Sequence, residues 1–482
     1  MRLRMIKLYT WIVLLISVLG CTTDFEDINT NPNAPVDVQP ALLLRKVIYD
    51  YAENMSYEGF VAGNLLSQHF TMIDFNLFDR HNLSSPQYGG NPWPILYKNL
   101  RDISLITDYS NENPTYEVYK GPSFILKALI SSTLTDIYGD VPFSEATKGL
   151  EGNINPKYDS QEAIYLGEHG IIALLNHGIE ALENYTGGIQ LQGDLLFSGD
   201  LDAWVRFANS LKIKALVRIS AKSDVSNELQ GIYNSGKYMK SNSQNAVFQF
   251  SAGQPNNFRM ANLRIGDVNL FVMSQTAFEI FDEWNDPRIA LFYRPLSTDN
   301  NQFNGLLNGP DASSTSISVS DYSLTGIVFR ENAAELKANI MTAWETQFLL
   351  AEAAERRLIS GNAKDLYESG VKLAFEYWKT EMPANYLNSG KAAFAKIGEN
   401  PIEQIITQKW IANTINGYES WIEYRRTRFP KLKTVSASLN NNLIPVRMPY
   451  PADEEALNKV NYEEAKTATN GNSVNAKVWW QD

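Results

Sequence analysis

Cysteine is almost absent from this chain, since Cys21 is the only one among 482 residues. A single cysteine excludes a disulfide within the chain and a zinc site made of several cysteines. Stability must therefore come from buried apolar surface, which a chain of this length can supply.

Histidine is scarce, and the familiar catalytic motifs are missing. The four histidines show none of the i+3 or i+4 spacings that place two metal ligands on one helix face. The chain has no Gly-x-Ser-x-Gly elbow, phosphate-binding glycine loop or His-Glu-x-x-His sequence. A glycosidase carboxylate pair is defined by its spatial separation, so the sequence leaves that possibility open. We predict a protein that is not an enzyme and that needs no metal or cofactor.

Positive charge is also in short supply. The chain has 54 acidic against 42 basic residues, which gives a net charge of −12. A nucleic-acid-binding protein needs an excess of cations to displace counterions from phosphates. The composition therefore argues against nucleic acid as a partner.

Long apolar runs are missing except at the N-terminus. There, Arg2, Arg4 and Lys7 precede an apolar run from Leu8 to Gly20. This run is too short to cross the ~30 Å core of a bilayer as a helix that rises 1.5 Å per residue. A basic flank before about a dozen apolar residues is typical of a secretory signal peptide, which we assign to residues 1–20.

Cys21 directly follows this run, in the order Val18-Leu19-Gly20-Cys21. The sequence resembles the lipobox of bacterial lipoproteins, in which the cysteine is acylated and becomes the N-terminus. Several acyl chains, at about 0.8 kcal/mol per buried methylene, would hold a protein on a membrane without a spanning helix. Residues 21–40 are polar and rich in Asn and Pro, and we predict that they form a lipidated tether. The alternative is a free thiol in an ordinary secreted protein.

Two helices folded against each other are predicted between Met341 and Trp378. Apolar residues recur every three or four positions in each half, which is the period of an amphipathic helix. Gly361 can end the first helix, and Asn362 can cap the second. Gly370 is small enough to let the two axes approach closely. One such hairpin cannot bury its own apolar face, so we expect others stacked beside it.

Further helical stripes are predicted at residues 126–137, 163–175 and 204–219. Their irregular spacing fits a stack with long insertions better than a uniform repeat array. The predicted fold class is therefore mainly α, built from tetratricopeptide-like helical hairpins in a single domain at residues 41–482.

The helical pattern fades between residues 241 and 335, where Asn, Ser, Gly and Pro are frequent. Short strands are predicted in this segment at residues 245–251, 289–294 and 326–329. We interpret the segment as a loop-rich, short-strand insertion on the helical scaffold.

Several short motifs, in a fixed order along the chain, carry a family resemblance. They are Asn-Thr-Asn-Pro-Asn at 29–33, Leu-Thr-Asp-Ile-Tyr-Gly-Asp-Val-Pro-Phe at 134–143, Phe-Leu-Leu-Ala-Glu-Ala at 348–353, Gln-Lys-Trp-Ile at 408–411, Trp421 with Arg425-Arg426-Thr427, and Arg-Met-Pro-Tyr-Pro at 447–451. Together they resemble the SusD/RagB family, and more narrowly its SusD-like branch of nutrient-binding outer-membrane lipoproteins from Bacteroidetes. The resemblance covers nearly all of the chain after the signal peptide.

The resemblance implies both an architecture and a function. It implies tetratricopeptide-like helix pairs, anchored by lipid on the extracellular side of the outer membrane. It implies a SusC-like TonB-dependent transporter as partner and a nutrient, usually a glycan, as ligand. The acidic residues Asp24, Glu26 and Asp27 are similar to the signal that sends such lipoproteins to the cell surface.

The physical chemistry of sugars suggests which residues would bind a glycan. A sugar ring packs its C–H face on an aromatic plane, while its hydroxyl groups need amides, carboxylates or guanidinium groups. Two loop regions, at 74–93 and 256–322, offer such residues. The predicted ligand contacts are Tyr88, Trp93, Phe258, Asn262, Arg264, Trp284 and Tyr322. We expect the rings of Tyr88, Trp93 or Tyr322 to face solvent. In the alternative interpretation, the rings are core residues that pin long loops to the helices.

The motifs most diagnostic of the family are predicted to be structural. Asp136, Tyr138 and Asp140 would pin a helix end to its neighbour. Trp421, Arg425 and Arg426 would pin the C-terminal section through buried hydrogen bonds and ion pairs. Two other functions stay open at this point. A peptide-binding, RagB-like protein would have a wide and deep interior cavity, and a purely structural lid would lack any solvent-facing aromatic cluster.

Overall fold

The computed structural model describes residues 39–84, 88–296, 302–311, 313 and 316–481. The predicted signal peptide, Cys21 and nearly all of the predicted tether lie outside these residues. Within the described part of the chain, no helix is long and apolar enough to cross a bilayer.

The helical hairpin predicted between residues 341 and 378 is confirmed. Its helices are α14 (Ala343–Glu355) and α15 (Ala363–Tyr377). Thr342 caps α14, because its hydroxyl accepts a hydrogen bond from the backbone N–H of Glu345. Asn362 caps α15 as predicted, since its side-chain oxygen accepts hydrogen bonds from two backbone N–H groups of the first turn.

Close packing within this hairpin depends on one glycine. A Cβ atom on Gly370 would lie 2.8 Å from the ring of Phe348, which is shorter than real contacts allow. The two helices therefore approach as closely as they do only because residue 370 has no side chain.

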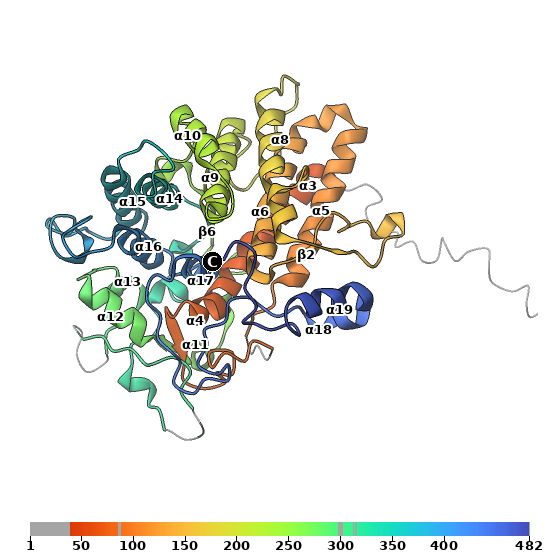
Figure 1. Cartoon of the computed structure of the whole chain (residues 1–482). Helices are drawn as coiled ribbons and strands as arrows, with labels where there is room; N and C mark the ends of the chain where they lie inside the picture. The colour runs from red at the N-terminus through yellow and green to blue at the C-terminus, as the bar shows by residue number, and fades with distance from the viewer. Residues whose placement is uncertain (1–38, 85–87, 297–301, 312, 314–315, 482) are drawn as a thin grey trace, which may run out of the picture.

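The remaining helices of the stack include those at the predicted stripes. They are α3 (Pro40–Glu58), α4 (Asn64–Leu66), α5 (Trp93–Glu112), α6 (Lys120–Tyr138), α7 (Gln161–Leu166), α8 (Ile171–Glu183), α9 (Leu201–Ile219), α10 (Ser226–Ser235), α16 (Pro401–Ala412) and α17 (Gly417–Thr427). In Figure 1 the stack forms an arc that runs from α5 through α6, α8 and α9 to α14 and α15. The predicted mainly α fold class is confirmed.

Charged side chains lie buried where α6, α9, α14, α16 and α17 meet. Arg218 pairs with Asp136, and its second terminal nitrogen lies 2.6 Å from a carboxylate oxygen of Glu419 and 3.0 Å from one of Glu423. The ammonium group of Lys409 lies 2.9 Å from the same oxygen of Glu419. These residues form the charge cluster together with Lys214, Glu345, Glu352 and Arg426. Each charge has a partner of opposite sign, so the cluster joins five helices without an uncompensated buried charge.

The short strands form three antiparallel pairs within the described residues. The pairs are β1 (Phe70–Met72) with β5 (Phe271–Met273), β2 (Val141–Pro142) with β3 (Tyr158–Asp159), and β4 (Ala246–Gln249) with β6 (Lys337–Met341). β4 lies within the strand predicted at residues 245–251. Two of these pairs join the loop-rich segment to the rest of the chain, because β1 and β6 lie outside residues 241–335.

Two of the strands predicted in the loop-rich segment are wrong. Residues 289–294 contain the short helix α13 (Ile289–Phe292), and residues 326–329 contain a 3-10 turn. In the first case Asp286 accepts a hydrogen bond from the backbone N–H of Arg288, and this bond favours a helical start. A short apolar run fits a strand and a buried helix equally well, so the sequence pattern could not separate them. The segment also contains α11 (Ile265–Val268) and α12 (Gln275–Glu283).

A group of phenylalanines packs the loop-rich segment against the helices. Phe60 lies in a five-residue π-helix at residues 59–63, which directly follows α3. Its ring centroid lies between 4.9 and 5.9 Å from four other rings. The aromatic cluster consists of Phe60, Phe70, Phe258, Phe271 and Phe329. Aromatic pairs of this kind add stability beyond their buried area.

The C-terminal section returns to the centre of the molecule, as Figure 1 shows. It contains the helices α18 (Ala452–Leu457) and α19 (Lys459–Ala468). The indole N–H of Trp480 donates a 2.9 Å hydrogen bond to Asp136. Trp421 and Arg425 donate hydrogen bonds of 2.9 and 2.7 Å to the backbone carbonyls of Pro445 and Val446. The structural role predicted for Asp136, Trp421 and Arg425 is confirmed.

Candidate ligand-binding groove

Trp93 does not face solvent, so this part of the prediction is wrong. Its side chain is buried, and its ring lies edge-on to that of Tyr138 with the centroids 4.9 Å apart. Proline on each side begins α5 at this residue, because proline fits the first helical turn. The indole is thereby turned into the interior, where it seals the junction between α5 and the end of α6.

Trp284 and Phe258 are buried as well, which corrects their prediction as ligand contacts. Trp284 is 7% exposed at the end of α12, and Phe258 is fully buried in the aromatic cluster. Both rings therefore fill the core beneath the loops. For these residues the alternative interpretation, in which the rings pin loops to helices, is confirmed.

Tyr88 and Arg264 lie together on one surface. The ring of Tyr88 is half-buried and packs on Phe271, with the centroids 5.8 Å apart. Burial raises the pKa of Tyr88, as does the nearby charge of Asp267, while Arg264 lowers it. The Arg264 side chain is 87% exposed and forms an ion pair of 3.0 Å with Asp267. This surface presents an aromatic face beside a guanidinium group.

Asn262 and Tyr322 make contacts of their own within the loop-rich segment. The amide oxygen of Asn262 accepts hydrogen bonds from Asn257 and Gln254, at 2.8 and 3.1 Å, so this residue helps to fold its own loop. Tyr322 is half-buried and follows a short 3-10 turn at residues 319–321. The predicted contacts thus do not gather into one site.

A groove with a volume of about 670 Å³ lies between α12, α13, Leu296 and residues 302–304. Ligand pockets for small molecules usually measure about 300–1,000 Å³. Phe278 and Phe303 are partly exposed in this groove, while Asp282, Asn285 and Gln302 are exposed beside them. Two aromatic rings surrounded by carboxylate and amide groups match the lining expected for a sugar.

One wall of the groove comes from α12. Phe278, Phe281 and Asp282 lie three and four positions apart, so they share one helix face. Phe281 is buried in the floor, whereas Phe278 is partly exposed. Ser274 begins this helix, because its hydroxyl accepts a hydrogen bond from the N–H of Thr276.

The opposite wall is fixed by hydrogen bonds from Asn304. Its side-chain amide donates a 2.8 Å bond to the carbonyl of Asp321, and its backbone N–H donates a 3.1 Å bond to the hydroxyl of Ser323. These bonds hold the neighbouring Phe303 in position. They also place Tyr322, which lies between the two acceptor residues in the chain, next to this wall.

A buried ion pair supports the end of the groove. Asp286 and Arg288 are both fully buried, and a terminal guanidinium nitrogen lies 2.5 Å from the carboxylate. The hydroxyl of Tyr386 also donates a hydrogen bond to Asp286. Asp286 is therefore committed to these partners, and Asp282 is the exposed carboxylate among the described residues of the groove.

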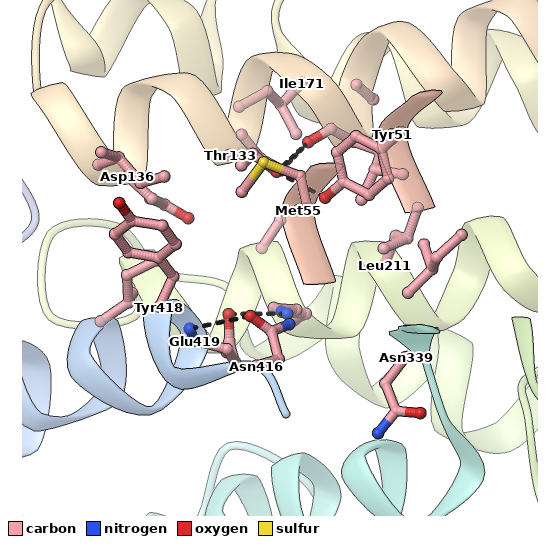
Figure 2. A pocket seen from close by; sticks show the side chains of 18 of the residues that line it. Tyr51, Met55, Thr133, Asp136, Ile171, Leu211, Asn339, Asn416, Tyr418 and Glu419 are labelled. Carbon is pink, nitrogen blue, oxygen red and sulfur yellow. Dashed lines mark hydrogen bonds and ion pairs between the residues drawn. The ribbon is translucent and has the colours of Figure 1, made fainter. Parts of the chain in front are cut away.

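An interior cavity between α3, α6, α9 and α17 has a different character. Figure 2 shows Tyr51, Met55, Asp136, Tyr418 and Glu419 around this space. Its volume is about 60 Å³, which is far below the ~300 Å³ of a small ligand pocket. A space of this size and polarity suits a few water molecules and cannot admit a sugar ring.

The residues that line the groove were mostly missed from the sequence. Phe278 belongs to a helical apolar pattern and is indistinguishable there from a core residue. Asp282, Asn285 and Gln302 are single polar residues whose neighbourhood depends on how two loops fold. Only Phe303 carried a usable signal, as an aromatic residue within a polar loop.

The fold defines a class of protein, namely a helical-repeat protein with a loop-rich insertion that carries a surface groove. Comparison with known families then gives the family itself. Residues 32–451 match a SusD-like family model described as starch-binding and associating with the outer membrane. The chain belongs to the SusD-like family, and the resemblance seen in its motifs is confirmed.

Solved structures agree with this assignment. A SusD homolog from Bacteroides fragilis has a TM-score of 0.79 and 24% identity, covering 92% of this chain and 100% of that chain. A chitin-binding SusD homolog from Flavobacterium johnsoniae has a TM-score of 0.75 and 22% identity, covering 91% and 98%. At these identities the similarity establishes the fold alone. The search of curated proteins found no match for this chain.

Proposed function

We propose that this protein binds a neutral oligosaccharide in the groove between α12 and residues 302–304. The observation that carries the proposal is the pair of partly exposed rings, Phe278 and Phe303, with exposed amide and carboxylate groups beside them. The rings can pack against the C–H face of a sugar, while Asn285 and Asp282 bind its hydroxyl groups.

A neutral ligand fits the charges of this groove. Arg288 at its end is fully buried and already paired with Asp286. An anionic sugar would therefore meet Asp282 with no free cation from the lining residues. Among the relatives, the chitin-binding homolog from Flavobacterium johnsoniae also binds a neutral polysaccharide. Tyr88, Asn262, Arg264 and Tyr322 stay predicted contacts for ligands longer than the groove.

We further propose that the protein is a lipoprotein on the extracellular side of the outer membrane. The basic flank, the apolar run and Cys21 support a lipid anchor, and the family is associated with the outer membrane. A SusC-like TonB-dependent transporter would receive the bound nutrient, as the family resemblance implies.

The lipid anchor can be tested by a substitution that exchanges only the sulfur of Cys21 for oxygen. Cys21→Ser removes the thiol that would be acylated, so the protein should move from the membrane fraction to the soluble fraction. Fractionation of cells that express each form, followed by immunoblotting, measures this change. A Cys21→Ser protein that still sediments with outer membranes would refute the anchor.

Catalysis is not part of the proposal. A glycosidase needs two carboxyl groups that flank the scissile bond. Of the two carboxylates that line this groove, Asp286 is held by Arg288 and Tyr386 and is fully buried. Among the described residues that line the groove, Asp282 is the one exposed carboxylate, and it suits hydrogen bonding to hydroxyl groups.

The two alternatives are less well supported. The small interior cavity does not provide the wide space expected for a peptide ligand. The partly exposed rings of Phe278 and Phe303 argue against a purely structural lid.

Calorimetric titration tests the proposed site. Detergent-solubilised protein would be titrated with neutral hexasaccharides made of glucose, mannose, xylose or N-acetylglucosamine units. Phe303→Ala removes one ring and should weaken binding by about tenfold, since one stacked ring contributes on the order of 1–1.5 kcal/mol. Tyr424→Ala is the matched control, because it removes a partly exposed ring from α17, outside the groove. Equal affinity of wild type and Phe303→Ala would rule out this groove.

A further inference from the structure

A second groove lies on the helical stack, outside the loop-rich segment. It runs between the outer sides of α6 and α8 and has a volume of about 550 Å³. This volume again falls in the range of small-ligand pockets. Phe124 and Tyr185 are partly exposed in it, and His177 lies near Phe124 with the ring centroids 6.0 Å apart.

The groove is built on a close contact between the two helices. A Cβ atom on Gly178 would lie 2.6 Å from the side chain of Ile125, and 3.2 Å from the backbone oxygen of Gly121. The backbones can therefore touch at this point only because both positions are glycine. Phe124 and Lys127 then lie on α6 directly beside this contact, so the framework under the groove is rigid.

Lys127 is the unusual residue of this groove. Burial lowers the pKa of its ammonium group, and the charge of Lys148 lowers it further, while Asp108 raises it. Among the described residues, no carboxylate lies within ion-pair distance of Lys127. Its ammonium nitrogen lies over the ring of Phe143, 5.7 Å from the ring centroid.

Comparison with other buried lysines shows why this matters. In the charge cluster, Lys214 lies 2.8 Å from Glu419, and Lys409 lies 2.9 Å from the same residue. Opposite charges raise the pKa of both lysines despite their burial. A largely buried cation without a counterion is costly, and an incoming anion would recover part of that cost.

The carboxylates near the groove do not fill this role. Glu117 lies 3.9 Å from Lys120 and is drawn toward that residue. Glu180, His169 and Asn184 also line the groove, and all three are exposed. These groups can bind hydroxyls, and Lys127 is the one lysine or arginine among the described residues that line the groove.

We propose that this groove binds an acidic saccharide, with a sugar carboxylate paired to Lys127 and the C–H face of the ring packed on Phe124 and Tyr185. The inference rests on the proposed function in one respect, because it assumes that the protein handles saccharides. It goes beyond that function, since the two grooves would bind different kinds of sugar unit. The groove at Phe303 selects neutral units, and the groove at Lys127 selects units that carry a carboxylate.

The test uses the detergent-solubilised full-length protein and two sets of probes. Tetramers of galacturonic, glucuronic and mannuronic acid are titrated calorimetrically, beside the neutral hexasaccharides described above. Lys127→Met removes the charge and keeps the length of the side chain, whereas Lys127→Arg keeps the charge. Because Lys127→Met removes a desolvated charge, its melting temperature should not fall, and a thermal unfolding scan checks this.

At least one uronic acid tetramer should bind the wild-type protein. Lys127→Met should weaken that binding by about tenfold or more, since a hydrogen bond to a charged group is lost. Lys127→Arg should stay within about threefold of wild type, and Phe303→Ala should have no effect on uronate binding. Binding should also weaken as salt concentration rises.

The remaining outcomes separate the two proposals. If neutral oligosaccharides bind through Phe303 and no uronate responds to Lys127→Met, the second groove is overturned and the proposed function stands. If uronates bind but lose affinity in Phe303→Ala, they occupy the first groove, and the inference is again overturned. If neither set of probes binds, both proposals fall.

Discussion

The helical stack and the loop-rich segment are held together by different forces. In the stack, the charge cluster joins five helices through buried ion pairs centred on Arg218 and Glu419. Under the loops, the aromatic cluster centred on Phe60 is apolar throughout. This difference shows in which region polar side chains remain available to bind a ligand. The stack buries a network of charges, whereas the described part of the loop-rich segment buries the single pair Asp286–Arg288 beside the groove and leaves Asp282, Asn285 and Gln302 exposed.

Removing one member of the charge cluster should have the largest effect on stability. Arg218→Met leaves Asp136, Glu419 and Glu423 without their shared partner, and an uncompensated buried charge costs about 3–5 kcal/mol. Equilibrium unfolding in urea measures this loss. The control is Lys237→Met, which breaks an exposed ion pair with Glu183 and should leave the unfolding midpoint unchanged. Equal midpoints for the wild type and Arg218→Met would show that the cluster does not hold the stack together.

Low pH should reduce the stability of the helical stack in particular. Burial alone would raise the pKa of Glu423, but Arg426, Lys409 and Arg218 outweigh it and hold the pKa well below the ordinary value. The pKa of Glu419 is lowered by Arg218, Lys214 and Lys409, again against the effect of burial. Above the ordinary pKa of about 4.3 both residues are ionised in the folded and unfolded states.

The sign of the pH effect follows from these shifts. As pH falls below about 5, the unfolded chain takes up protons on these glutamates before the folded protein does. Stability is therefore present in full at neutral pH and declines progressively toward pH 3. Urea midpoints measured between pH 7 and pH 3 test this, with Arg218→Met expected to show a shallower decline. An unchanged midpoint down to pH 3 would contradict the account.

A smaller pH effect on stability, opposite in sign, is expected from Glu58, where the loops meet α3. Glu58 ends this helix, and its carboxylate accepts a 2.6 Å hydrogen bond from the N–H of Gly90. Burial raises the pKa of Glu58 to about 7, although the N–H of Gly90 and the charge of Arg259 favour the ionised form.

The folded protein therefore keeps a proton on Glu58 that the unfolded chain has already lost at the same pH. This contribution to stability is present below about pH 4.5 and is lost as pH rises through about 7. Glu58→Gln should flatten the pH dependence of the urea midpoint between pH 5 and 8. The same slope in wild type and Glu58→Gln would show that another group titrates there.

Much of the fold could be predicted because helical signals are local. The hairpin at residues 341–378 is encoded by its periodicity, by the cap at Asn362 and by the small Gly370, all within one segment of chain. The short element at residues 289–292 could not be predicted in the same way. Its helical start depends on Asp286 and Arg288, whose buried pairing is completed by Gln408, distant in the sequence.

The candidate site was harder to predict, because burial decides the role of an aromatic residue. Trp93 sits between prolines in a polar neighbourhood, and only packing against Tyr138 shows that it belongs to the core. Phe278 shows the reverse case. Its helical spacing is typical of a core residue, but its ring lines the groove. A single sequence records composition and spacing, but it does not record which face of a loop meets solvent.

The most direct test of the account is a crystal structure of the protein bound to a neutral hexasaccharide that it binds in titration. We predict electron density for a sugar ring against Phe303 and Phe278, with hydroxyl groups in hydrogen-bond contact with Asn285 or Asp282. A neutral oligosaccharide seated only on the helical stack, away from the loop-rich segment, would contradict the central claim.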